Sequence, residues 1–186
     1  MRILVFSDIH SNLTALEAVP HFIRMLEGYM ETPSPRDLPV VKSLVTALGE
    51  LRALEAVPIL QCVLRGYVGA RSLAAAALGD IGDPRAGEAL TEALRDRSAG
   101  LRLTALKSLG YLEYREAIPH VRSLLSDADP RVRRAACTTL GQLGDREAIP
   151  QLLAMVDEDP SPLARPAAVE ALALLGDTNL LPQLLP

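Results

Sequence analysis

The sequence predicts an all-α protein, an α-solenoid of about five helix pairs preceded by a short N-terminal segment of β-type and helical character. Two signals recur in phase along the chain: a Leu-Gly or equivalent pair, and a tetrapeptide that usually ends in proline. Hydrophobic residues make up 49% of the 186 residues but aromatic residues only 3%, so Ala, Leu and Val dominate. Such a composition favours helices over a large sheet.

The two signals define one repeating unit, because each copy of the first is followed by a copy of the second. The first signal occurs at Leu48-Gly49, Leu78-Gly79, Leu109-Gly110, Leu140-Gly141 and Leu172-Ala173. The second begins at Glu55, Arg85, Glu116, Glu147 and Asn179. Two phased signals in a period of about 31 residues indicate two elements per repeat.

Both elements have the spacing of a helix. Apolar residues at 132–143 recur at intervals of three and four, and Gly144 then ends the run. Residues 149–156 repeat the pattern, with Pro150 in the first turn, where its missing N–H removes no internal hydrogen bond. Pairs this short cannot bury their apolar stripe alone, so a linear stack is expected. The repeats are predicted at 36–66, 67–97, 98–128, 129–159 and 160–186.

The repeated stretches 77–86 and 129–136 resemble the HEAT family, especially the short type called phycobilisome-lyase-like repeats. The resemblance covers roughly residues 37–186. Small residues share one column of the repeats, which should let neighbouring first helices approach closely: Ala74, Ala105, Ala136 and Ala168.

Two charged columns accompany these helices. Arginines align at Arg71, Arg102, Arg133 and Arg165, and aspartates align at Asp83, Asp145 and Asp177. One interpretation is a structural ladder of Arg–Asp pairs between neighbouring repeats, which the HEAT resemblance also implies. The other is a basic stripe that binds phosphate or an acidic partner.

Residues 1–35 do not fit the repeat. A β-type run at 2–6 leads into Asp8 and His10, and this opening resembles the start of a calcineurin-like metallophosphoesterase, whose Asp-x-His pair supplies ligands to a two-metal site. The other ligand motifs of that family are missing, so the pair is either vestigial or completed by another chain. The segment is expected to run into a half repeat and then a linker from Gly28 to Asp37.

Composition and motifs also limit the function. The net charge of -4 and the absence of Trp argue against a nucleic-acid partner. No run approaches a membrane span and no signal peptide is evident, which predicts a cytoplasmic protein. Cys62 and Cys137 are expected to be reduced, buried hydrophobes. No hydrolase triad or cofactor motif is present, so no catalytic residue, cofactor or enzyme activity is predicted.

These observations favour a scaffold that binds a partner protein along the surface lined by the second helices. Helical spacing brings five polar residues to that surface: Gln61, Glu92, His120, Arg122 and Gln151. Two alternatives remain open, a phycobilin lyase-like subunit and a metallophosphoesterase fragment that needs another chain.

The C-terminal repeat is short and ends in apolar residues. Leu181 and Leu184 have no following repeat to cover them, so we expect self-association or docking of another chain there. Fraying of this short helix is the alternative.

Overall fold

The computed structural model describes residues 17–176, and all regular elements in this range are helices. The predicted all-α class is therefore confirmed. The chain divides into two compact units, Met1–Asp83 and Pro84–Pro186. Several predicted features lie outside the described residues: the β-type run at 2–6, Asp8, His10, Asp177, Leu181 and Leu184.

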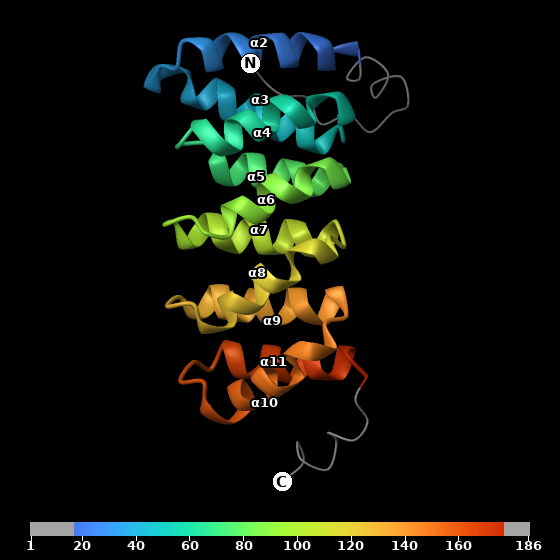
Figure 1. Cartoon of the computed structure of the whole chain (residues 1–186). Helices are drawn as coiled ribbons and strands as arrows, with labels where there is room; N and C mark the ends of the chain where they lie inside the picture. The colour runs from blue at the N-terminus through green and yellow to red at the C-terminus, as the bar shows by residue number, and fades with distance from the viewer. Residues whose placement is uncertain (1–16, 177–186) are drawn as a thin grey trace. The chain divides into compact units, whose positions relative to one another are not determined.

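The first unit holds four described helices, coloured blue to green in Figure 1. They are α2 (Val19–Glu31), α3 (Leu38–Glu50), α4 (Val57–Gly66) and α5 (Arg71–Ile81). α2 packs on α3 and α4, and α5 packs on the same two helices. The predicted linker from Gly28 is wrong at its start, because α2 continues through Gly28 to Glu31. The helix ends just before Pro33, whose ring disfavours helical geometry in the preceding residue.

The second unit holds six described helices, coloured green to red in Figure 1. They are α6 (Gly87–Ala93), α7 (Ala99–Tyr111), α8 (Ile118–Ser123), α9 (Pro130–Leu143), α10 (Ile149–Glu158) and α11 (Ala164–Leu174). The first helices of successive repeats stack in the order α7, α9, α11. Each second helix packs on the next first helix, α6 on α7, α8 on α9 and α10 on α11.

A left-handed residue follows the first helix in every repeat described, as the Gly144 signal predicted. Glycine occupies the position at Gly82, Gly144 and Gly176, where φ is 76°, 72° and 70°. Arg52 and Glu113 hold the same position in the other two repeats, with φ of 49° and 51°. Left-handed backbone is costly for residues with a Cβ. Arg52 and Glu113 adopt it nevertheless, so the same turn geometry recurs in the repeats that lack the glycine.

The tetrapeptide signal begins the second helix. A single 3-10 turn precedes α4, α8 and α10, and Pro58, Pro119 and Pro150 lie in the first turn of those helices. The N–H groups of a first helical turn have no partner within the helix, so proline begins these helices without losing a hydrogen bond.

Small residues allow the first helices to pack closely, as predicted. The four alanines of the column Ala74, Ala105, Ala136 and Ala168 are fully buried. The glycine of the Leu-Gly signal marks a second close approach. A Cβ built on Gly49 would lie 2.8 Å from the Ala77 Cβ, and one on Gly141 would lie 3.1 Å from the Ala171 Cα. The recurring glycine is therefore explained by contact with the next first helix.

The two cysteines are both free but differ in environment. Cys137 is fully buried 3.8 Å from the Met155 sulfur, and burial raises the pKa of its thiol to about 12, so it behaves as a core residue. Cys62 is exposed, which corrects the prediction of burial. It follows Gln61 on α4. Among residues 17–176, no helix combines the length and apolarity needed to cross a membrane.

Candidate functional site

All five residues predicted for the partner surface lie on second helices. Glu92 on α6 and Gln151 on α10 are exposed, and His120 and Arg122 on α8 are half-buried. Gln61 lies on α4 in the first unit, so it is described apart from the other four.

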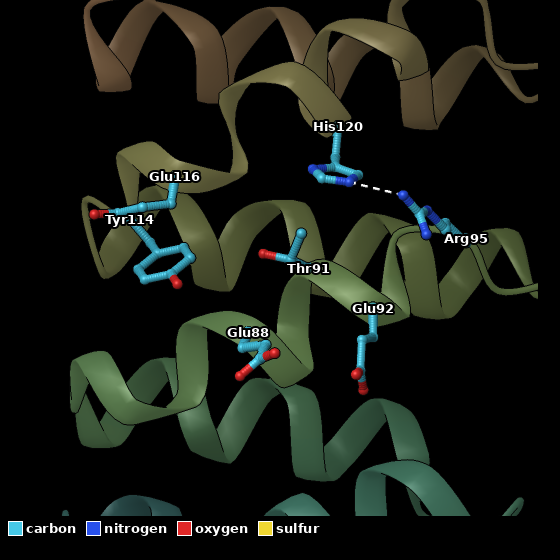
Figure 2. A pocket seen from close by; sticks show the side chains of 7 residues that line it. All are labelled: Glu88, Thr91, Glu92, Arg95, Tyr114, Glu116 and His120. Atoms are coloured by element: carbon cyan, nitrogen blue, oxygen red, sulfur yellow. Dashed lines mark hydrogen bonds between the residues drawn. The ribbon is translucent and has the colours of Figure 1, made fainter.

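The structure brings Glu92 and His120 together at a hollow of about 150 Å³. Figure 2 shows the lining side chains, which come from α6, from α8 and from the turns beside them. The residues that line the hollow are Glu88, Thr91, Glu92, Arg95, Tyr114, Glu116 and His120. Arg122 and Gln151 lie outside it.

The hollow lies where two neighbouring repeats depart from the repeat sequence. Gly87 stands where other repeats carry a branched residue, at Val57, Ile118 and Ile149. Tyr114 occupies the position that is aspartate at Asp83, Asp145 and Asp177. A Cβ on Gly87 would collide with the Tyr114 ring, so the two departures depend on each other. Sequence spacing missed this pair, although both exceptions are visible in an alignment of the repeats.

A hydrogen bond links the two repeats across the hollow. Arg95 Nη2 lies 2.8 Å from His120 Nε2 (Figure 2). Guanidinium has donors but no acceptor, so Nε2 accepts and the ring proton is on Nδ1. His120 Nδ1 is buried and has no hydrogen-bond partner among the described residues. His120 lines the hollow, but this atom lies beneath its surface.

The residues that line the hollow carry charges of both signs, with more acidic than basic side chains. The three glutamates, Glu88, Glu92 and Glu116, are exposed, while Arg95 contributes the permanent positive charge. Nowhere in residues 17–176 do three or more His, Cys, Asp or Glu side chains group so that they could hold a metal ion. The lining therefore offers exposed carboxylates and one guanidinium to the solvent.

Arg122, predicted to face a partner, is held by the chain itself. It donates to the buried Asp145 carboxylate at 2.7 Å and pairs with Glu147 at 2.7 Å. The Asp145 hydrogen bond, with support from Glu147, raises the pKa of Arg122 above its usual value. These bonds connect the repeat of α8 to the turn before α10.

The predicted arginine column has a shared structural role. Each of its four side chains donates to a backbone carbonyl near the end of the second helix that precedes it. The bonds run from Arg71 to Leu64 O, Arg102 to Asp96 O, Arg133 to Asp127 O and Arg165 to Val156 O, at 2.8, 2.8, 2.9 and 2.9 Å. Carbonyls at helix ends lack internal partners, and a cation there also complements the helix dipole.

Arg102 and Arg133 also pair with aspartates, but not with the aspartates predicted. Arg102 binds Asp127 at 2.8 and 2.7 Å, and Arg133 binds Asp159 at 2.8 Å through both nitrogens. These aspartates lie in the turn between repeats, within reach of the first helix. Asp145 lies in the turn inside a repeat and pairs instead with Arg122, while Asp83 is buried. The spacing of Asp96, Asp127 and Asp159, at 31 and 32 residues, was the signal that could have identified the ladder.

Comparison with family models identifies the repeats. The model of HEAT repeats matches residues 88–173, and the model of the PBS lyase HEAT-like repeat matches residues 70–96. Residues 70–173 are therefore matched by models of HEAT-like repeats. Nothing in these matches supports the predicted metallophosphoesterase resemblance of residues 1–19.

Solved structures of related shape include two informative cases. A chain from the complex of CpcE and CpcF of phycocyanin lyase from Nostoc sp. PCC7120 is 25% identical, with a TM-score of 0.65; the alignment covers 84% of this chain and 99% of that one. An engineered protein is 18% identical over 81% of this chain and 78% of its own, with a TM-score of 0.58, which shows the fold alone. A search of curated proteins found no match.

The Arg–Asp ladder of the HEAT-like repeats should make the protein sensitive to acid. Arg133 holds the pKa of Asp159 below its usual value, mainly through its hydrogen bonds. The stabilisation is therefore complete above the unfolded pKa of about 4 and is lost as the pH falls towards the folded value. Urea unfolding at decreasing pH should show a falling free energy of unfolding, with a smaller decrease in Asp159→Asn. If the free energy of unfolding falls equally in the parent and in Asp159→Asn, Asp159 does not contribute to the acid sensitivity.

Proposed function

We propose that this chain is a scaffold that binds a partner protein along the surface lined by its second helices. The proposed scaffold comprises the repeats at 36–66, 67–97, 98–128, 129–159 and 160–186. Solenoids present similar helices side by side and thereby create an extended surface for a partner. Glu92, His120 and Gln151 are proposed to contribute to this surface, with Gln61 in the first unit.

The observation that carries the proposal is the paired departure at Gly87 and Tyr114. A stack of identical repeats would need neither residue. Gly87 also lacks the apolar side chain that other repeats carry at this position, and with it the stabilisation that burial of such a side chain gives. The Tyr114 ring, for which Gly87 leaves room, lines a hollow beside three exposed glutamates and His120.

We expect a double variant, Glu88→Lys with Glu92→Lys, to lose partners that the parent captures. Both side chains are exposed, so the change reverses charge at the hollow with little effect on the core. Each immobilised protein would be incubated with lysate of the native host, and bound proteins compared by quantitative mass spectrometry. A loss of at least about tenfold is expected for specific partners, as one strong polar contact can account for it.

The matched control carries the same charge change away from the second helices. Glu113 lies in a turn and Glu170 on α11, and both are exposed. Glu113→Lys with Glu170→Lys should capture the same proteins as the parent. Equal capture by all three proteins would contradict binding at the hollow.

A second function is proposed on the likeness to the phycocyanin lyase complex, since the alignment spans 99% of the matched chain. In this alternative the chain is one subunit of a lyase-like assembly that acts on a phycobiliprotein. Co-expression with a phycocyanin polypeptide and its bilin separates the two functions. A chain-dependent mass increase of the polypeptide would support lyase activity and overturn the prediction that the protein is not an enzyme.

A further inference from the structure

A second hollow of about 400 Å³ lies on the first helices of the second unit, away from the proposed second-helix surface. One wall is formed by α7, whose Leu103, Lys107 and Tyr111 recur at intervals of four and share one face. The other wall is formed by α9, with Arg131 and Arg134 near its start. We call this hollow the first-helix groove.

The groove is positively charged although the whole chain carries a net charge of -4. Its lining includes Lys107, Arg131 and Arg134 and no acidic side chain. Arg131 is neutralised by Asp129 at 2.7 Å. Lys107 and Arg134 are exposed, and neither has an acidic partner within the described residues. The groove therefore offers two uncompensated cations to a ligand.

Apolar side chains flank these cations. Tyr111 is 68% exposed and Leu163, at the start of α11, is 44% exposed. Tyrosine and arginine are enriched at protein interfaces, where they contribute disproportionately to affinity. An open groove with exposed apolar residues at its edges suits a protein segment better than a buried small molecule.

The walls of the groove are fixed in the free protein. Thr139 donates from its hydroxyl to the Leu106 carbonyl at 3.1 Å, a buried bond that joins α9 to α7. Gly110 on α7 leaves room for the end of the Gln142 side chain of α9, which an added Cβ would force to move. Binding to a preformed groove loses less conformational entropy than binding that must order its walls.

We propose that the first-helix groove docks an acidic segment of a partner protein, with carboxylates at Lys107 and Arg134 and a bulky apolar side chain between Tyr111 and Leu163. Charge complementarity decides between occupants, because the groove carries uncompensated positive charge and no acidic lining residue. This site is independent of the hollow at His120 and uses the other helix of each repeat.

The test uses a fluorescent peptide of about 15 residues, long enough for a helix to form, with Glu and Leu at alternate helical turns. Its binding to the full chain would be measured by fluorescence anisotropy at low ionic strength. Lys107→Glu with Arg134→Glu should weaken binding by at least about tenfold, and Tyr111→Ala by a smaller factor. Raised salt should weaken binding to the parent.

The control variant Arg115→Glu with Arg146→Glu makes the same charge change at two exposed arginines outside the groove. It should bind the peptide like the parent, while a peptide with Gln in place of Glu should bind weakly to both. Equal weakening by the two double variants would reveal a nonspecific charge effect and overturn the proposal. Absence of peptide binding, or equal affinity for the Gln peptide, would also overturn it.

Discussion

Arg133→Ala is expected to lower the free energy of unfolding by about 1 to 3 kcal/mol, because it leaves a largely buried carboxylate and a helix-end carbonyl without their donor. The Arg133 side chain is 12% exposed and that of Asp159 6%. All three guanidinium nitrogens of Arg133 donate hydrogen bonds, two of them to the Asp159 carboxylate and one to Asp127 O. Urea denaturation followed by circular dichroism would measure the change.

The neighbouring arginine provides the control. Arg134 is exposed and has no acidic partner in residues 17–176, so Arg134→Ala should unfold like the parent to within about 0.5 kcal/mol. In a double-mutant cycle, Arg133→Ala with Asp159→Asn should lower the free energy of unfolding by less than the sum of the two single changes, because each single change already removes the interaction. If Arg133→Ala and Arg134→Ala have the same free energy of unfolding, the Arg133–Asp159 pair does not stabilise the protein. The interpretation of the arginine column as a binding stripe would then be favoured.

The ladder also couples one repeat to the next. Asp127 accepts from Arg102 with its carboxylate and from Arg133 with its carbonyl. The same carboxylate accepts from the Asp129 N–H, and Asp159 accepts from the Ser161 N–H in the same way. Each aspartate therefore fixes the turn that starts the next repeat while it binds the arginine of the preceding one. Effects of substitution at Arg102 and Arg133 should not add.

Helix starts and stops were predictable from sequence because proline and glycine act locally. Pro150 sets the first turn of α10, and Gly144 adopts the left-handed angle that ends α9. A column of recurring residues shows which positions are equivalent but not how far their side chains reach. The arginines were identified as a column, but they were assigned to the aspartate column of Asp83 and Asp145 and not to the equally regular column that contains Asp127 and Asp159.

The candidate site was predictable only in part. Helical spacing placed Glu92 and His120 on the outer side of their helices, and both line the hollow. One lining residue of the hollow, Tyr114, has its ring against Gly87, a contact between repeats that no spacing rule within one helix contains. The first-helix groove was missed for the same reason, since its walls belong to α7 and α9, two helices that α8 separates in sequence.

Gly49→Ala should destabilise the protein even though alanine is the better helix former. The added Cβ would lie 2.8 Å from the Ala77 Cβ and 2.9 Å from the Ala77 Cα, so α3 and α5 would have to separate. Overpacking of this kind costs about 1 to 3 kcal/mol, more than the gain of about 1 kcal/mol from helix propensity. Urea denaturation would show a lower midpoint with an unchanged slope.

Two further variants distinguish this collision from an effect of glycine as such. Gly28 in α2 has no atom within 4 Å of an added Cβ, so Gly28→Ala should raise the free energy of unfolding by about 0.5 to 1 kcal/mol. Adding Ala77→Gly to Gly49→Ala removes the Cβ–Cβ contact but keeps the contact with the Ala77 Cα, so rescue should be incomplete. A Gly49→Ala protein as stable as the parent would show that the helices can separate freely, and the Leu-Gly signal would then need a cause other than close packing.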